Sequence, residues 1–240
     1  MNATATTVPS KSIPSGDLSI STLMAFTAGF VDTCGFVALF GLFTAHVTGN
    51  FVLIGATLAS SRPGVLAKLL AFPVFILTVA ATQACLHRCK RTGRDPARPV
   101  LVAQALFLAL FLGLGVCASP VQDADALLTI LIGMAGVAAM AIQNVAARTV
   151  FSGHAPTTVM TGNVTQAVMD AVEVAYGADA GAAKERLRKM LPPVFGFAGG
   201  AVLAGVSFAR VGFWCVGIAL VAMAFVIWTY RPQTKVQQSR

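Results

Sequence analysis

The stretch "TAHVTGNFVLIGA", residues 44–56, places a histidine, two threonines and an asparagine inside an otherwise apolar region. A second stretch, "TTVMTGNVTQAVM" at residues 157–169, repeats the triplet Thr-Gly-Asn in a similar apolar setting. Threonine and asparagine side chains can bond free backbone groups, and glycine permits a tight turn. The repetition indicates that the chain interrupts the same kind of element twice.

The composition predicts a membrane protein. Of the 240 residues, 56% are hydrophobic and 11% are charged, with a mean hydropathy of +0.78. A soluble domain cannot bury that much apolar surface, so lipid must solvate it. The net charge of +8 would favour a nucleic-acid partner in a soluble protein, but here the basic residues fall in short clusters between apolar runs. That pattern is a topology signal and predicts the lipid bilayer, with no nucleic acid, as the partner.

Six apolar runs are long enough to cross about 30 Å of hydrocarbon as helices. They cover residues 18–43, 64–87, 99–118, 125–148, 190–209 and 211–230. Two further segments, 47–60 and 157–175, are short or polar. We expect an all-α polytopic protein in which these two short segments are re-entrant or interfacial helices.

Charge decides whether the short segments cross the membrane. If they do not cross and both termini are cytoplasmic, fourteen of the seventeen Lys and Arg residues fall on the cytoplasmic side. If both cross, the basic loops "RCKRTGRDPARP" and "KERLRK" lie on opposite faces, and the bias disappears. Cytoplasmic loops collect Lys and Arg, which favours six spans with both termini inside. The polar residues 1–17 and 231–240 are expected to be disordered tails around one transmembrane domain, residues 18–230.

The two Thr-Gly-Asn triplets also align the two halves of the chain. "GFVDTCGFVALFGLFTAHVTGN" matches "AIQNVAARTVFSGHAPTTVMTGN" with one inserted residue, which sets Asp32 opposite Asn144. Each half, 18–118 and 125–230, contains three spans, so the second half is inverted relative to the first. The sequence therefore predicts an inverted internal repeat.

A hairpin that enters the membrane and returns exposes backbone groups at its turn, and protein or a wet cavity must satisfy them. Thr48 and Asn50 in the first copy, and Thr161 and Asn163 in the second, can supply those bonds. With one hairpin entering from each face, we expect Asn50 and Asn163 to meet near the midplane and form a substrate or ion site. The alternative is that each triplet only caps a short surface helix.

Two titratable residues lie near these segments. Asp32 is about fourteen residues into the first span, where a charged acid costs about 3 kcal/mol unless it is paired or hydrated. It could carry a proton or bind a cation, and His46, which is expected nearer a membrane surface, could share that role. Alternatively, Asp32 only holds a broken helix together.

Asn144 keeps the shape of Asp32 and removes its charge, so the two halves are not equivalent. Arg148 lies one turn later and could neutralise Asp32 or bind an anionic substrate, since a guanidinium holds oxyanions in a fork. More often, an arginine at this depth is an interfacial anchor.

The stretches "AGFVDTCGF" and "LFTAHVTGN", together with "AIQNVAARTV" and "TTVMTGN", resemble the two hallmark stretches of the YoaK-like family of small bacterial inner-membrane proteins. The similarity covers about residues 18–230. Where that family commonly reads Gly-Tyr-Val-Asp-Ala, this chain has Phe30 in place of the tyrosine and Thr33 after the acid. The resemblance implies a multi-span protein of the bacterial inner membrane, but it brings no agreed substrate.

Other chemistry is poorly supported. In "CLHRC", Cys85 and Cys89 share a helix face while His87 points away, so we expect no metal site and no cofactor. Nothing resembles a catalytic constellation, and we expect no enzymatic activity. "GFAGGAVLAG", residues 196–205, has the small-residue spacing that allows close helix contact, either inside the chain or in a homo-oligomer.

Two functions fit these observations. The first is transport of a small solute or ion, with proton coupling through Asp32. The second is a non-transporting membrane scaffold or partner subunit whose polar residues only tie helices together.

Overall fold

The computed structural model describes residues 15–60, 63–177 and 180–231, with the side chains of residues 15–18 left aside. Within these ranges the chain is helical and contains no strand, which confirms the expected fold class. The expected tails lie almost entirely outside the described residues. The elements are α1 Ser15–Ala38, α2 Gly49–Ala59, α3 Val65–Arg91, α4 Ala97–Cys117, α5 Leu127–Thr149, α6 Met160–Tyr176, α7 Ala180–Val211, the 3-10 helix η1 Gly212–Cys215 and α8 Val216–Thr229.

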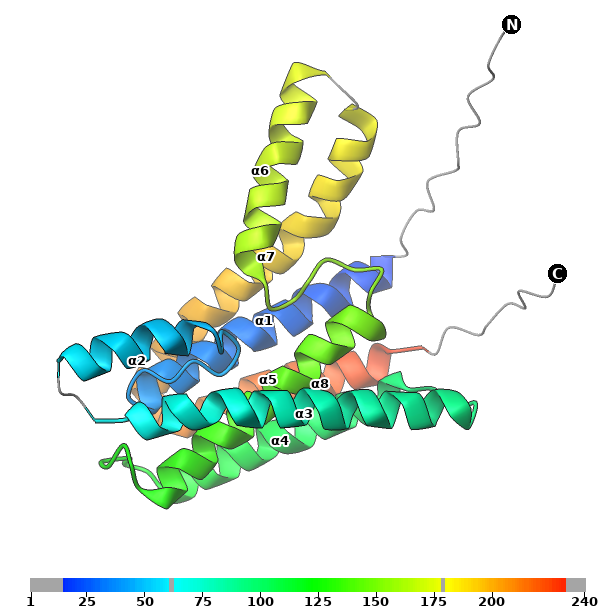
Figure 1. The fold of residues 1–240 in the computed structure, drawn as a ribbon. Helices are drawn as coiled ribbons and strands as arrows, with labels where there is room; N and C mark the ends of the chain where they lie inside the picture. The colour runs from blue at the N-terminus through cyan, green and yellow to red at the C-terminus, as the bar shows by residue number, and fades with distance from the viewer. Residues whose placement is uncertain (1–14, 61–62, 178–179, 232–240) are drawn as a thin grey trace, which may run out of the picture.

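The described residues hold five helical stretches long and apolar enough to cross a membrane. They are Ser19–Ala38, Val65–Arg91, Ala97–Cys117, Leu127–Thr149 and Ala180–Thr229. The last stretch contains both α7 and α8, which are separated at Gly212, where φ is +56°. Figure 1 shows α8 running back from this turn toward the end of the bundle where α1 begins. The protein is therefore a polytopic membrane protein.

The connections separate into two ends of the bundle. The start of α1, the α3–α4 connection and the end of α8 lie at one end, on the right in Figure 1. The α2–α3, α4–α5 and α7–η1 connections lie at the opposite end. The first end carries a dense group of basic residues between α3 and α4, namely Arg88, Lys90, Arg91, Arg94 and Arg98.

Helices α1 and α7 cross with their backbones in contact. A Cβ added at Gly200 would collide with the carbonyl oxygen of Phe26, and one added at Gly196 would lie 2.6 Å from the carbonyl oxygen of Thr22. Gly29 on α1 is closed in the same way by the backbone of Phe197. Small residues allow this approach in lipid, where packing drives helix association. One face of the glycine-rich segment is thus used inside the chain, and the homo-oligomer stays a prediction.

Two helix boundaries differ from the expected ones. α1 ends at Ala38, not residue 43, because Phe40 and Gly41 adopt left-handed φ values of +53° and +80° that stop the helix. α7 begins at Ala180, ten residues before the expected start at 190. Pro192 and Pro193 lie inside the helix.

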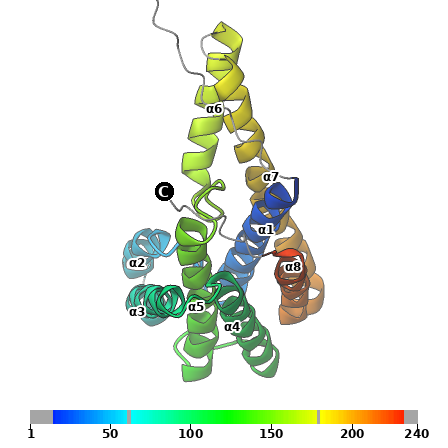
Figure 2. The same cartoon turned by 90° about the vertical axis from the view of Figure 1, so that its right-hand side faces the viewer.

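The early start of α7 has a cause in its contacts with α6. Arg186 donates to Asp170 at 2.8 Å and to Glu173 at 2.7 Å, and Gln166 donates to Asp170 at 3.0 Å. The Asp170 side chain is fully buried. These bonds join α6 and α7 into a hairpin that projects away from the other helices in both views (Figures 1 and 2).

Candidate functional site

The chain returns into the bundle twice, through a first turn at residues 39–48 and a second turn at residues 150–159. The first turn follows the left-handed residues Phe40 and Gly41. Lys68 on α3 is almost fully buried, and its ammonium donates to the carbonyl oxygens of Phe40 at 2.8 Å and Gly64 at 3.0 Å. This cation satisfies backbone acceptors that the broken helix leaves free.

Asp32 holds the first turn against α1. Its Oδ1 accepts from the backbone N–H groups of Thr44 at 2.8 Å and Ala45 at 2.6 Å, with longer contacts of 3.4 Å to the backbone N–H of His46 and the hydroxyl of Thr44. Only 5% of the side chain is exposed. These donors supply hydrogen bonds that water would otherwise give to the carboxyl group.

His46 is the titratable side chain that reaches this acid. Its Nδ1 lies 2.6 Å from Asp32 Oδ2, and 40% of its side chain is exposed. The reversal of the chain at Phe40 brings the imidazole back to the level of Asp32, so the two residues that were expected to share one role are in direct contact.

The two asparagines of the repeated triplet perform the same task. Asn50 accepts from the N–H of Phe43 at 2.9 Å and donates to its carbonyl oxygen at 2.8 Å, seven residues earlier. Asn163 donates to the carbonyl oxygen of Pro156 at 2.7 Å, again seven residues earlier. Both side chains are buried. The hydrogen bonds that join each asparagine side chain to the backbone lie within that residue's own turn. These bonds hold each turn separately, and the meeting of Asn50 with Asn163 stays a prediction.

Asn144, the residue that the sequence aligns with Asp32, also contacts the turn that follows its helix. Its Oδ1 accepts from the hydroxyl of Thr158 in the second turn at 2.7 Å, and its Nδ2 donates to the carbonyl oxygen of Met140 at 3.0 Å. Asn144 therefore contacts its turn through one neutral hydroxyl, whereas Asp32 contacts its turn through backbone amides and an imidazole.

Two glutamines, neither of them among the expected site residues, support the second turn. Gln143 is fully buried and donates to the hydroxyl of Thr157 at 3.1 Å and to the carbonyl oxygen of Met24 at 2.8 Å. Gln104 on α4 donates to Gln143 at 2.6 Å. The signal for Gln104 was present in the sequence, because it is a lone amide within the apolar run "LVAQALFL".

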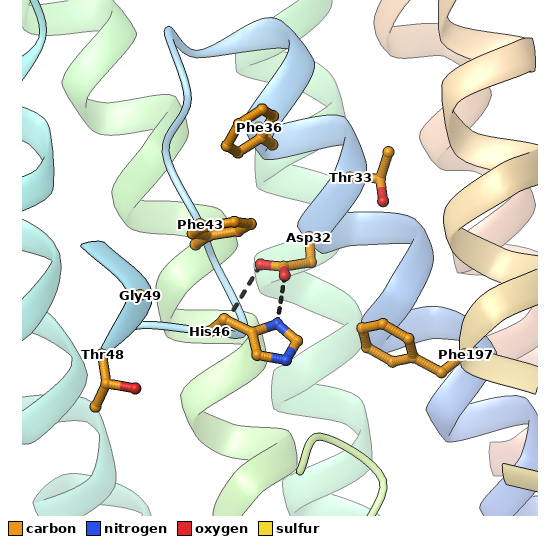
Figure 3. Close-up of a pocket in the computed structure, with 8 residues that line it drawn as sticks. All are labelled: Asp32, Thr33, Phe36, Phe43, His46, Thr48, Gly49 and Phe197. Atoms are coloured by element: carbon orange, nitrogen blue, oxygen red, sulfur yellow. Dashed lines mark hydrogen bonds and ion pairs between the residues drawn. The ribbon is translucent and has the colours of Figure 1, made fainter. Parts of the chain in front are cut away.

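Two cavities border these turns. The acid cavity has a volume of about 510 Å³ and is lined by Asp32, Thr33, Phe36, Phe43, His46, Thr48, Gly49 and Phe197 (Figure 3). The inter-turn cavity has a volume of about 330 Å³, and its lining includes His46, Thr48, Asn144, Thr158 and Thr161. His46 and Thr48 line both, so the cavities are neighbours. Both volumes are in the range that small ligands occupy.

The structure thus gathers most of the expected site residues around two adjoining cavities. Asp32, His46, Thr48, Asn144 and Thr161 line them, whereas Asn50 and Asn163 lie behind as backbone clamps. Arg148 is exposed at the end of α5, and the side chain that pairs with Asp32 is His46 instead. Among the described residues, no ion pair joins Arg148 to Asp32.

The short helices are polar inside and apolar outside. On α2, Asn50 and Thr57 are buried while Phe51, Val52 and Leu58 are exposed. On α6, Asn163 and Asp170 are buried, and the exposed side chains include Val164, Val168, Met169 and Val172. A helix on a water-facing surface has the opposite arrangement. The side chains that both short helices expose are therefore largely apolar, and their re-entrant position stays a prediction.

Comparison with known proteins identifies the family. The family described as "Protein of unknown function (DUF1275)" matches residues 20–229, nearly the whole chain. The chain belongs to this family. The match covers both turns and both cavities, so the site described above lies wholly inside the family region.

A curated relative supports the same assignment. The chain is 29% identical over 153 residues to the UPF0700 transmembrane protein YoaK of Bacillus subtilis (strain 168), covering 63% of this chain and 66% of the relative. The expected resemblance to a YoaK-like family is confirmed. No solved structure matches the chain.

Proposed function

We propose that the protein moves a small solute across the bacterial inner membrane and that Asp32 and His46 couple this movement to protons. The observation that carries the proposal is the inter-turn cavity, which both broken segments line and which shares His46 and Thr48 with the acid cavity. Discontinuous helices that meet inside a bilayer form the substrate sites of many transporters. A carboxylate paired with an imidazole at such a site can exchange a proton near neutral pH.

The coupling step follows from the bonds of Asp32. In its charged form, the acid accepts two short backbone bonds from the first turn and one from His46. Protonation of the carboxyl weakens all three hydrogen bonds together, and this releases the turn from α1. The turn is the wall between the two cavities, so its release changes which cavity the solute can enter.

The helix contacts support an inverted duplication. Helix pairs α1–α7, α4–α5 and α6–α7 in contact have counterparts in α3–α5, α1–α8 and α2–α3, if the first four helices correspond to the last four. The pair α4–α8 corresponds to itself. A duplicated chain with an odd number of spans per half generates two similar halves of opposite orientation, which is the basis for alternating access.

The basic end of the bundle supports the proposed orientation. With the α3–α4 connection in the cytoplasm, the start of α1 and the end of α8 are at the same face. We also keep as predictions that the protein has no enzymatic activity and that it forms a homo-oligomer.

A non-transporting scaffold or partner subunit is the second candidate. It is favoured by the number of hydrogen bonds at Asp32, because four donors within 3.4 Å give the carboxylate a structural role in fastening the turn even without transport. The two candidates differ in what Asp32→Asn does. An asparagine keeps an acceptor for the turn but cannot exchange a proton.

The test uses purified protein in liposomes with an imposed pH gradient and a panel of small solutes. We expect gradient-dependent uptake of at least one solute, lost in Asp32→Asn and retained in Asp123→Asn, which changes an exposed acid in the α4–α5 connection. If no solute moves, the scaffold candidate replaces the transporter. If Asp32→Asn and the unmodified protein transport equally, the transporter stands and the coupling role of Asp32 is wrong.

A further inference from the structure

The acid cavity is walled mainly by aromatic rings that come from three parts of the chain. Phe36 belongs to α1, Phe43 and His46 to the first turn, and Phe197 to α7 (Figure 3). The ring centroids of Phe36 and Phe43 lie 4.9 Å apart, and those of His46 and Phe197 lie 5.5 Å apart with an interplanar angle of 85°. The carboxylate of Asp32 lies among these rings.

This combination of groups favours the binding of a positively charged ligand in the acid cavity. The faces of aromatic rings carry negative electrostatic potential and attract cations, most strongly where water is excluded. The buried carboxylate adds a full negative charge, and neither lysine nor arginine lines the cavity. Apolar walls favour a cation that carries carbon substituents over a hydrated metal ion, which needs several oxygen ligands.

We propose that the acid cavity binds a small organic cation of the alkylammonium class, with its charged group between Asp32 and the ring of Phe197. The proposal rests on the proposed function and names the substrate class of the same site. The cavity volume of about 510 Å³ accommodates such a molecule.

The cation and a proton on His46 exclude one another. When His46 is protonated, the Asp32–His46 pair is neutral and the cavity offers no net charge. When the imidazole loses its proton to water, the pair carries one negative charge that an ammonium group can neutralise. Binding of one cation is therefore linked to release of one proton, which is the stoichiometry of an antiporter.

No other titratable side chain intervenes among the residues that line this cavity. The titratable pair is Asp32 from α1 and His46 from the first turn, and the residue that α7 contributes, Phe197, does not titrate. Lys68 lines a neighbouring cavity that shares Phe36, and its ammonium is held by two backbone carbonyls. The pH dependence of cation binding therefore reports on the Asp32–His46 pair.

Calorimetry on purified protein in a non-ionic detergent tests the binding. The probes are choline and its uncharged isostere 3,3-dimethylbutan-1-ol, which differ only in the central nitrogen or carbon atom. We expect choline to bind roughly thirtyfold more tightly than the alcohol. We also expect its affinity to rise as the pH increases, approaching tenfold per pH unit while His46 is protonated. Equal affinities for the two probes, or affinity for choline that does not change with pH, overturn the proposal.

Variants locate the site. Phe197→Leu removes the ring and keeps an apolar wall, and we expect it to weaken choline binding about tenfold. Phe195→Leu is the matched control, because Phe195 is exposed on the same helix two residues earlier. We expect that variant to bind as the unmodified protein does. If both variants bind choline equally well, the cation does not contact Phe197 and the proposed site is wrong.

Transport measurements separate this proposal from the broader one. Choline-loaded liposomes should release choline when protons are supplied outside, with one proton entering for each cation. If other solutes move in an Asp32-dependent way while choline neither binds nor moves, the cation class is wrong and the transporter stands. If choline binds with the expected pH dependence and nothing is transported, the cation site stands and the transporter fails.

Discussion

The first turn and the second turn bring the chain back into the bundle with the same clamp but different anchors. In each, the asparagine of Thr-Gly-Asn bonds the backbone seven residues earlier. The first turn is then fixed by the carboxylate of Asp32, whereas the second is fixed by the amide of Asn144. The clamp is therefore a requirement of the fold, and the charge is a separate feature that only one turn has. We expect variants to affect the two turns unequally.

Removing the two anchors should give the largest difference. Asp32→Ala leaves the N–H groups of Thr44 and Ala45 and the ring of His46 without their acceptor, at a cost of about 3–5 kcal/mol. Asn144→Ala leaves only the hydroxyl of Thr158 to find another acceptor, at about 1 kcal/mol. Free energies of unfolding in mixed micelles measure both. Equal losses would show that charge adds nothing to the first turn.

The second-largest difference in stability is expected between glycine variants that disturb the two helices preceding the turns, α1 and α5. Gly200→Ala pushes a methyl group into the backbone of α1, which carries Asp32, and should cost about 2–3 kcal/mol. On α5, which carries Asn144, an added Cβ at Gly136 meets side chains and no backbone, namely the methyl group of Thr44 at 2.9 Å and the ring of Phe111 at 3.3 Å. Gly136→Ala should therefore cost about 1 kcal/mol.

Gly199→Ala is the control for these glycine variants, and its expected effect on stability has the opposite sign. Gly199 is next to Gly200, but a Cβ there meets nothing within 4 Å. Gly199→Ala should stabilise the protein by about 0.5 kcal/mol, because alanine is the better helix former. Thermal unfolding of the three variants in one detergent ranks them, and a loss of stability in Gly199→Ala contradicts the crossing described for α1 and α7.

The clamps themselves should differ less. Asn50→Ala removes two bonds and leaves the buried N–H of Phe43 unpaired, which costs about 2 kcal/mol. Asn163→Ala removes one bond to Pro156, a residue with no N–H, and should cost about 1 kcal/mol. Hydrogen exchange of the two turns, followed by mass spectrometry, should show faster exchange at residues 39–48 in the first variant. An identical response in both variants would mean that the two asparagines stabilise their turns equally.

The smallest effect should come from giving the second turn a charge. Asn144→Asp keeps the bond from Thr158 but sets a carboxylate against the carbonyl oxygen of Met140, at a cost of about 1 kcal/mol at neutral pH. Because the cost belongs to the charged form, it should shrink as the pH falls and the new carboxyl takes up a proton. Unfolding measured between pH 5 and 8 against the unmodified protein checks the sign. A cost that grows toward low pH contradicts the assignment.

Much of the fold could be predicted from the sequence because lipid imposes simple rules. Apolar length locates the spans, and the repeated Thr-Gly-Asn triplet locates both interruptions. The end of α7 nearest α6 could not be located in this way, because its early start depends on Arg186 pairing with two acids of another helix. Such a pairing has no periodic signal.

The candidate site was only partly predictable for a related reason. A buried acid in a span is conspicuous, and Asp32 was singled out on that ground. Its partner was not, because the sequence offered Arg148 as the counter-charge, and the contact between His46 and Asp32 depends on the path of the first turn. Phe197 on α7 and Thr158 in the second turn reach the site through tertiary contacts alone. Aromatic and hydroxyl side chains are common in spans, so nothing in the sequence distinguishes these two.

The polar inner faces of α2 and α6 have a consequence for biosynthesis. α2 has 11 residues. Its length is therefore about 16 Å, too short to span the bilayer by itself. Asp32 on α1 accepts from backbone N–H groups of its preceding turn, and α2 packs against α3. α2 can complete these contacts only after α3, which follows it in the chain, has been synthesised. α6 depends in the same way on α7.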